Sequence, residues 1–336
     1  MKKSLIRVLA VLMAVLSLFS SCSRRRMQAA GDAQEGLTAE EILALKNPAQ
    51  PDLIVDGTAY VRKRNLTTVL FMGIDQKGDL DAASGGSGGQ CDVLLLLVVD
   101  GDAKKQTLLQ LDRDTMTEVE VLDYNGNPTG FTLVQQICLS HSYGNGGEKS
   151  CENTVRAVSR FLLDTPVDGY VAMLYDAVPV LNDAVGGVTV TIRDDFSTSD
   201  PAFVKGSVVT LQGQQALTYV RGRMKVADGT NGNRMARQRE YMSAFSGKVR
   251  NMVKTDSSVI NDLYYAAEPY MLSSMTLGEL TSVAAEGLAY TDGGIVTTAG
   301  EHREAVYANG KTYAEFYAEE DNILEIVLSL FYTQIS

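Results

Sequence analysis

The chain has 336 residues, of which 45% are hydrophobic and 21% charged, and its formal net charge is −11. This length predicts one large domain or two smaller ones, with enough apolar residues for a substantial core. The acidic balance argues against nucleic acid as a partner, because binding along a nucleic acid requires clustered Lys and Arg. It does not exclude a local basic pocket.

Residues 1–22 have the features of an export signal. Basic residues precede an apolar run over 8–19, and two serines and then Cys22 follow it. Such a run is typical of a secretory signal and is shorter than most membrane spans. A Cys directly after small residues resembles a lipidation box, although Phe19 stands where such boxes usually carry Leu. Lipidation of Cys22, or an uncleaved signal anchor as the alternative, would place the chain outside the cytoplasm and tether it to the membrane.

Residues 23–65 are predicted to be a membrane tether with little structure, apart from a short helix after the capping box of Thr38 and Glu41. A single globular domain is expected over 66–336. Three further cysteines follow, at positions 91, 138 and 151, and the last two are near enough in sequence to pair. No pair has C-x-x-C spacing, so a metal site built from these cysteines is not expected.

Three short apolar runs, rich in Val and Leu and bounded by Gly or Asp, are predicted to be buried strands. They cover Val69–Ile74, Val93–Val99 and Thr107–Leu111. Asp75 closes the first run, Asp92 opens the second, and Asp112-Arg113-Asp114 closes the third.

If these strands run up, down and up, Asp75, Asp92 and Arg113 emerge at one edge of one sheet. Two carboxylates beside an arginine would suit a divalent cation that holds a phosphate. The alternative is that each Asp only caps a turn, as Asp often does. The Gly-rich stretch between Asp75 and Asp92 lacks the spacing of a phosphate-binding loop, and it is interpreted as a mobile lip or a plain surface loop.

Residues 118–151 look irregular, and His141 within them is expected to be structural. After them helices and strands alternate, which indicates α/β layering. The predicted elements are a helix over Glu152–Leu163, a strand over Tyr170–Leu174, a helix over Ala177–Val185 and a strand over Val188–Ile192.

A second charged cluster lies between residues 211 and 241 and includes Arg221 and Arg223. A helix there carries Arg234, Arg237, Gln238 and Tyr241 on one face, with an opposing apolar stripe from Met242 to Met252. A row of arginines near a helix N-terminus favours an anion site. A solvated basic face is the alternative.

The rest of the chain is expected to complete the same domain. Its predicted elements are helices near Val259–Met271 and Leu277–Leu288, a strand at Ile295–Ala299, a hairpin around Asn309-Gly310 and a final helix from Glu320 to Tyr332.

The two charged clusters together resemble the LytR–CpsA–Psr family of cell-wall glycopolymer ligases. The matching segments occur in family order over about residues 66–250, and they are VLFMGID, CDVLLLLVVD, LLQLDRDT, LSHSYGNGG, LNDAVGGVTVTI, LQGQQALTYVRGR and NRMARQR.

This resemblance implies an α/β fold with a central mixed sheet flanked by helices and a hydrophobic pocket for a polyprenyl lipid. It implies an extracytoplasmic magnesium-dependent phosphotransferase that moves a phosphoglycosyl polymer from a polyprenyl pyrophosphate to peptidoglycan. Asp75 and Asp92 match the Mg²⁺-binding carboxylates. The residues that match the surroundings of the phosphates are Arg113, Arg221, Arg223, Arg234, Arg237 and Gln238.

Several positions depart from the family pattern. Gln90 stands where an Arg usually lies, Cys91 replaces Ser or Thr, Asp112 replaces Pro, and Asn231 stands where an Asp is common. The loss of an arginine at Gln90 and of a carboxylate at Asn231 could lower activity or alter the donor, and it motivates one alternative to transfer, a polyprenyl-phosphate binding module without catalysis. A polyprenyl-pyrophosphate hydrolase, with water as the acceptor, is a third possibility. In the transfer reaction, Asp114 or Asp75 is the candidate general base, and the sequence does not choose between them.

Overall fold

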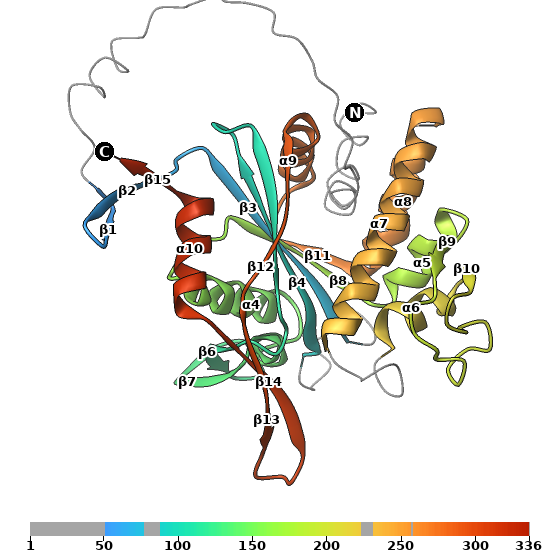
Figure 1. Cartoon of the computed structure of the whole chain (residues 1–336), viewed down its shortest axis with the longest axis horizontal. Helices are drawn as coiled ribbons and strands as arrows, with labels where there is room; N and C mark the ends of the chain where they lie inside the picture. The colour runs from blue at the N-terminus through green and yellow to red at the C-terminus, as the bar shows by residue number, and fades with distance from the viewer. Residues whose placement is uncertain (1–50, 77–87, 223–230, 257, 336) are drawn as a thin grey trace, which may run out of the picture.

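The computed structural model describes residues 51–76, 88–222, 231–256 and 258–335 (Figure 1). The predicted signal peptide, Cys22 and most of the predicted tether lie outside these residues. Arg223 and most of the Gly-rich loop also lie outside them. Among the helices of the described ranges, none is both long and apolar enough to cross a membrane.

A central six-stranded sheet organises the fold. Its strands lie in the order β11 (Met271–Ser273), β8 (Gly169–Leu174), β3 (Leu66–Asp75), β4 (Gln90–Asp100), β5 (Lys105–Leu111) and β12 (Thr291–Thr297). The sheet is mixed, because β3 is antiparallel to β4 and parallel to β8, and β5 is antiparallel to β4 and parallel to β12. The predicted central mixed sheet is therefore confirmed.

The up, down and up course of the first three strands is also confirmed. Asp75 pairs with Gln90 across β3 and β4, and Leu94 pairs with Leu111 across β4 and β5. The end of β3, the start of β4 and the end of β5 therefore meet at one edge of the sheet.

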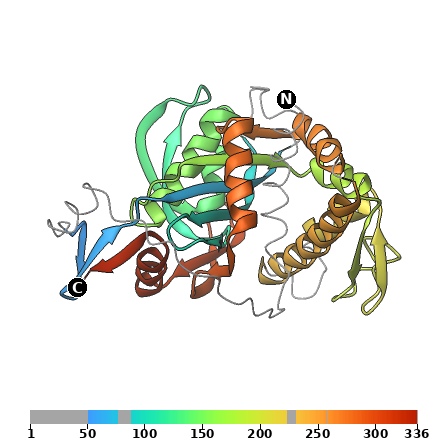
Figure 2. The same cartoon turned by 90° about the horizontal axis from the view of Figure 1, so that it is seen from above.

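Side chains alternate between two buried faces of these strands, as the period of two requires. One face packs on α4 (Glu148–Phe161) and α10 (Glu320–Phe331), where Leu70, Met72 and Leu96 join Val158 and Phe331 in one core cluster. The other face carries Phe71 and Leu97 and packs on α9 (Leu277–Ala289) through Leu280 and Val283. Figures 1 and 2 show α4 and α10 on one side of the sheet and α7 and α8 on the other.

A second apolar cluster lies beyond that second face. It packs two strands, which form a hairpin, against four helices, with Phe196, Phe203 and Tyr219 as its aromatic centre. The elements are α5 (Ala177–Ala184), β9 (Val188–Thr191), β10 (Val208–Leu211), α6 (Gln214–Arg221), α7 (Asn231–Thr255) and α8 (Val259–Ala267).

The interpretation of residues 118–151 as irregular is wrong at their start. Strands β6 (Met116–Leu122) and β7 (Pro128–Gln136) form an antiparallel hairpin, followed by the 3-10 helix η1 (Ile137–Ser142). Most of β7 is exposed, so both of its faces carry mixed side chains and no alternation of polar and apolar residues marks it as a strand.

The structured part begins before residue 66, the expected start of the domain. Strands β1 (Leu53–Val55) and β2 (Thr58–Arg62) form a hairpin, and β2 pairs with the last strand, β15 (Tyr332–Ile335). The predicted C-terminal hairpin is present as β13 (Gly300–Val306) and β14 (Thr312–Ala318). The helix expected to reach Met271 ends at Ala267, and the short 3-10 helix η2 (Glu268–Tyr270) leads into β11.

Candidate functional site

Asp92 is the centre of a buried charge cluster at this edge of the sheet. Arg113 donates from Nη1 to Oδ1 of Asp92, and Arg234 donates from Nη1 to Oδ2 across 3.1 Å. The three side chains come from the start of β4, the turn after β5 and the first turns of α7, and each is less than 10% exposed. Two guanidinium groups thus share one buried carboxylate, and such groups offer paired donors that suit an anionic ligand.

The Arg113 guanidinium is held on its remaining sides by polar neighbours. Its Nε donates to Oδ1 of Asp114 across 3.1 Å, and its Nη2 donates to Oε1 of Gln90 across 2.8 Å. Gln136 from β7 donates to the same Asp114 oxygen. These contacts fix the plane of the guanidinium before any ligand arrives.

Asp114 is only 1% exposed, so it is a positioning residue for Arg113. The tight turn that carries it is closed by Asp112, whose Oδ1 accepts from the backbone N–H of Asp114 across 2.9 Å. The other Asp112 oxygen lies 3.3 Å from Nε2 of His302, which β13 contributes.

Asp75 and Arg221 form a more exposed pair at the mouth of the site. Arg221 donates from Nη2 to Oδ1 of Asp75, and both side chains are more than a third exposed. The Arg221 guanidinium also lies over the ring of Tyr175, 5.6 Å from its centroid. This pair is in contact with solvent, whereas the Asp92 cluster is buried.

The structure does not place Arg237 in contact with Asp75 or Asp92. Its Nε donates to the carbonyl oxygen of Tyr219 and its Nη2 to that of Gly222, at the C-terminal end of α6. Gln238 donates to the neighbouring carbonyl of Val220 across 3.3 Å. Both side chains therefore join α7 to the end of α6, and so help to position Arg221.

The expected division of α7 into an arginine face and an opposing apolar stripe is wrong. Arg234, Gln238, Tyr241, Phe245 and Val249 are all buried and follow one another at helical spacing, so they form one continuous stripe. Its N-terminal part meets Asp92, and the remainder packs in the second core cluster. A buried arginine is tolerated here because the carboxylate that pairs with it comes from β4.

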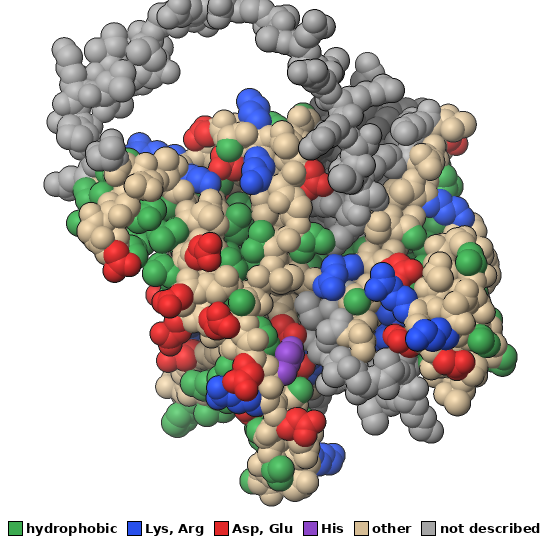
Figure 3. Space-filling model, in the orientation of Figure 1, with side chains coloured by type: hydrophobic (Ala, Val, Ile, Leu, Met, Phe, Trp, Pro, Cys, Tyr) green, Lys and Arg blue, Asp and Glu red, His purple; other side chains and the backbone are tan. Residues whose placement is uncertain are grey.

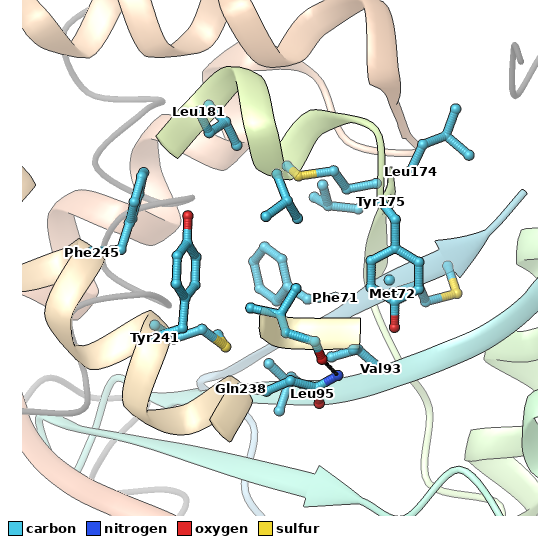
Figure 4. A pocket seen from close by; sticks show the side chains of 16 residues that line it. Phe71, Met72, Val93, Leu95, Leu174, Tyr175, Leu181, Gln238, Tyr241 and Phe245 are labelled. Carbon is cyan, nitrogen blue, oxygen red and sulfur yellow. Dashed lines mark hydrogen bonds between the residues drawn. The ribbon is translucent and has the colours of Figure 1, made fainter. Parts of the chain in front are cut away.

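An apolar cavity of about 170 Å³ lies beside the charge cluster, far larger than the roughly 15 Å³ that one water requires. Figure 4 shows Phe71 and Leu95 of the sheet on one side, with Leu181 of α5 and Tyr241 and Phe245 of α7 around it. The predicted hydrophobic pocket is thus present between the sheet and these helices.

His141 is structural, as expected. It is fully buried, its Nδ1–H donates to the carbonyl oxygen of Gly89 across 2.9 Å, and its Nε2 lies 3.6 Å from the sulfur of Cys151. Burial lowers the pKa of His141 to about 4, so the ring is neutral and holds the start of β4 in place. Within the described residues the three cysteines after Cys22 are free buried thiols, and the suggested pairing of Cys138 with Cys151 is absent.

The two expected metal ligands, Asp75 and Asp92, fit Mg²⁺ only as part of a larger set of ligands. Within the described residues, no three His, Cys, Asp or Glu side chains gather into a metal-binding group. Mg²⁺ is commonly held by one or two carboxylates, with phosphate oxygens and waters as the other ligands. Asp75 and Asp92 at one edge of the sheet fit an ion that binds together with a phosphate-bearing ligand.

Sequence reasoning missed the contributions of Gln90 and Tyr175 to this site. Gln90 was treated only as the loss of an arginine, yet it accepts a hydrogen bond from Arg113. Tyr175 follows the predicted strand Tyr170–Leu174 directly, as Asp75 follows its own strand. The parallel pairing of β8 with β3 brings these two strand ends together. Tyr175 could have been placed at the site from the sequence by assuming that these two strands pair in parallel.

Charge on the molecular surface is unevenly spread. On the face drawn in Figure 3, Lys and Arg side chains gather beside α7 and the β9–β10 hairpin, whereas acidic side chains dominate over α10 and the β13–β14 hairpin. The acidic net charge of the chain therefore coexists with a local basic region, as the composition allowed.

Comparison with solved structures places this fold among known ones. The crystal structure of Bacillus subtilis TagV superposes with a TM-score of 0.56 at 24% identity, over 80% of this chain and 96% of that one. Protein gbs0355 from Streptococcus agalactiae superposes with a TM-score of 0.61 at 22% identity, over 79% of this chain and 86% of that one.

Sequence relatives match this chain over part of their lengths. The polyisoprenyl-teichoic acid–peptidoglycan teichoic acid transferase TagU of Bacillus subtilis (strain 168) is 27% identical over 231 residues, which are 69% of this chain and 67% of that protein. Biofilm regulatory protein A of Streptococcus mutans is 33% identical over 189 residues, which are 54% of this chain and 44% of that protein. The match thus spans two thirds or less of the length of these relatives.

The family assignment rests on a broader match than either relative provides. The model of the LytR_cpsA_psr family covers residues 31–327. This range includes the charge cluster, the apolar cavity and all six strands of the central sheet. The chain belongs to the LytR–CpsA–Psr family.

Proposed function

We propose that this chain transfers a phosphate-linked glycopolymer from a polyprenyl pyrophosphate carrier to peptidoglycan. The relatives named as polyisoprenyl-teichoic acid–peptidoglycan teichoic acid transferases support this class of reaction.

One observation carries the proposal, namely that three elements each contribute both to the charged groups of the site and to the apolar cavity. Strand β4 supplies Asp92 to the cluster and Val93 to the cavity. Helix α6 supplies Arg221 at the mouth of the site and Val220 to the cavity, and α7 supplies Arg234 to the cluster and Tyr241 to the cavity. A ligand that fills both parts needs an anionic head joined to an apolar tail, which describes a polyprenyl phosphate.

Arg113 and Arg234 would bind the phosphate oxygens, because guanidinium groups offer paired donors to them. Both are fixed by Asp92 and, for Arg113, by Asp114 and Gln90, so little reorganisation is needed when charge develops on the departing phosphate. Arg221 would close over the head group from the mouth of the site.

Asp75 and Asp92 would hold Mg²⁺, which when bound would neutralise part of the pyrophosphate charge. Of the two candidate bases, Asp114 is buried beneath Arg113, whereas Asp75 is partly exposed at the mouth. The exposure of Asp75 favours it over Asp114 as the carboxylate that would accept the proton of an incoming sugar hydroxyl.

A carrier-binding module without transfer is the second candidate, and Gln90 favours it. The residue that the family usually provides here would add a further cation beside Arg113, whereas Gln90 contributes a neutral acceptor. Such a module would bind the lipid and release no product.

A transfer assay separates these candidates. The full chain in detergent micelles is mixed with a polyprenyl-pyrophosphate glycan and a peptidoglycan oligomer, with and without Mg²⁺, and products are identified by mass spectrometry. Transfer predicts a glycan–phosphate–glycan product that depends on Mg²⁺ and is lost in Asp92→Ala. Bound lipid without product supports the binding module, and phosphate release without a sugar acceptor supports hydrolysis.

The proposal also places the domain outside the cytoplasm, anchored by a lipid on Cys22. The support is the sequence of residues 1–22. Mass spectrometry of the membrane-bound protein tests it, since Cys22→Ser should abolish the diacylglycerol mass and release the chain from the membrane. An unchanged membrane fraction would favour the uncleaved signal anchor.

A further inference from the structure

Tyr175 lies on the boundary between the charge cluster and the apolar cavity. It follows β8 directly, its side chain is buried, and it is one of the residues that line the cavity. Its ring lies beneath the Arg221 guanidinium at the mouth of the site. Figure 4 shows the ring at one end of the cavity, away from Tyr241 and Phe245.

The hydroxyl of Tyr175 is buried and has no hydrogen-bond partner within the described residues. Tyr241 lines the same cavity, and its hydroxyl donates to Oδ1 of Asn182 across 3.3 Å. A buried hydroxyl usually finds a partner, because leaving it unpaired costs stability. The contrast between these two tyrosines indicates that the partner of Tyr175 is a ligand.

The groups around the hydroxyl indicate what kind of ligand atom would bind to it. Burial raises the pKa of Tyr175, and the nearby Asp92 carboxylate raises it further, so the hydroxyl keeps its proton and can donate. Arg113 and Arg234 are near enough to act on the same hydroxyl. A donor in a site that also holds two guanidinium groups favours an anionic acceptor.

We propose that Tyr175 donates a hydrogen bond to a phosphate oxygen of the polyprenyl carrier, at the junction of its head group and its apolar chain. This inference rests on the proposed function, since it requires a lipid phosphate in the site. It assigns Tyr175 a specific task, which is to distinguish a polyprenyl phosphate from the uncharged polyprenol with the same chain.

Two matched variants test this assignment in the full chain in detergent micelles. The probes are polyprenyl phosphate and polyprenol of equal chain length, and the readouts are the two dissociation constants and the melting temperature. Tyr175→Phe should weaken polyprenyl phosphate binding roughly ten- to hundredfold, the range expected for a hydrogen bond to a charged group, and leave polyprenol binding unchanged. Its melting temperature should not fall, because no hydrogen bond of the free protein is lost.

Tyr241→Phe is the control, since it removes a hydroxyl that is paired within the protein. It should lower the melting temperature by about 2–4 °C and leave the ratio of the two dissociation constants as in the wild type. The assignment of Tyr175 would be overturned if Tyr175→Phe kept the wild-type ratio of the two dissociation constants. It would also be overturned if the melting temperature of Tyr175→Phe fell as in Tyr241→Phe. Either result would leave the proposed function intact. A wild-type protein with no preference for polyprenyl phosphate would overturn the proposed function as well.

Discussion

Arg234 donates to Oδ2 of Asp92 across 3.1 Å, and both side chains are buried. This contact joins the N-terminal part of α7 to the start of β4. Removing either partner of such a pair leaves a buried charge less well compensated, and the cost exceeds that of breaking an exposed pair. The site therefore contains two kinds of arginine: we expect the buried ones to support the fold and bind ligand, and the exposed Arg221 to bind ligand alone.

The two kinds are separated by comparing Arg234→Ala with Arg221→Ala. Arg221 pairs with Asp75 at a solvent-exposed position, so its loss should change the free energy of unfolding by less than about 1 kcal/mol. Arg234→Ala should cost more, up to about 3 kcal/mol, with Arg113 still paired to Asp92. Urea unfolding measures both.

Lipid binding should fall in both arginine variants, roughly tenfold or more, because each removes charged donors to phosphate. An Arg221→Ala protein that binds polyprenyl pyrophosphate as tightly as the wild type would remove that residue from the site. A large loss of stability in Arg221→Ala would contradict the distinction between the two kinds.

His141 makes stability depend on pH. Its folded pKa is lowered to about 4 from an ordinary value of 6.5, so the unfolded chain takes up this proton first as the pH falls. The stabilising contribution is present above pH 6.5 and declines as the pH falls through the folded pKa. The complete loss of this contribution would lower the free energy of unfolding by on the order of 3 kcal/mol.

His141→Gln is the test of that contribution. The variant should be less stable than the wild type at pH 7, and the difference between the two proteins should shrink on going to pH 4.5, as measured by urea unfolding. A difference that stays constant across this range would show that His141 does not titrate with a lowered pKa.

Part of this site could be predicted from the sequence for a simple geometric reason. Consecutive antiparallel strands place the end of one beside the start of the next, so Asp75, Asp92 and Arg113 were expected at one edge, and they lie there. The arrival of Arg234 beside Asp92 depends on how α7 packs. No local pattern encodes that packing.

The error about α7 has a related cause. Charged residues on a helix usually face solvent, so the arginines were assigned to one face and the apolar residues to the other. The spacing of Arg234, Gln238, Tyr241 and Phe245 fits one stripe equally well, and the structure shows that stripe to be buried. The buried position of Arg234 depends on the Asp92 carboxylate of β4, which the tertiary structure brings beside it.

Filling the cavity should separate tail binding from head-group binding. Leu181→Trp places a larger side chain in the cavity from α5. We expect the affinity for a long-chain polyprenyl phosphate to fall, while a short-chain isoprenyl phosphate, which depends mainly on the arginines, binds nearly as before. Isothermal titration with both ligands measures this, and equal losses for both would contradict a tail in this cavity.

Gln90 offers a test of how charge beside Arg113 sets affinity. Gln90→Arg replaces a hydrogen-bond acceptor of Arg113 with a second cation, so the melting temperature without ligand should fall. The rise in melting temperature on adding polyprenyl phosphate should be larger than in the wild type, because the ligand then neutralises more charge.

Gln90→Glu is the matched opposite, since it keeps an acceptor for Arg113 and adds a negative charge. It should reduce the rise in melting temperature caused by the ligand. If both variants respond to polyprenyl phosphate as the wild type does, Gln90 lies too far from the bound phosphate to influence it.

The central claim is that one amphiphilic ligand occupies the charge cluster and the apolar cavity together. A crystal structure of the chain with a polyprenyl pyrophosphate tests it most directly. Phosphate oxygens should lie within hydrogen-bond distance of Arg113 and Arg234, with an isoprenyl chain between Phe71 and Phe245. A lipid chain bound elsewhere, or phosphates that contact neither arginine, would contradict it.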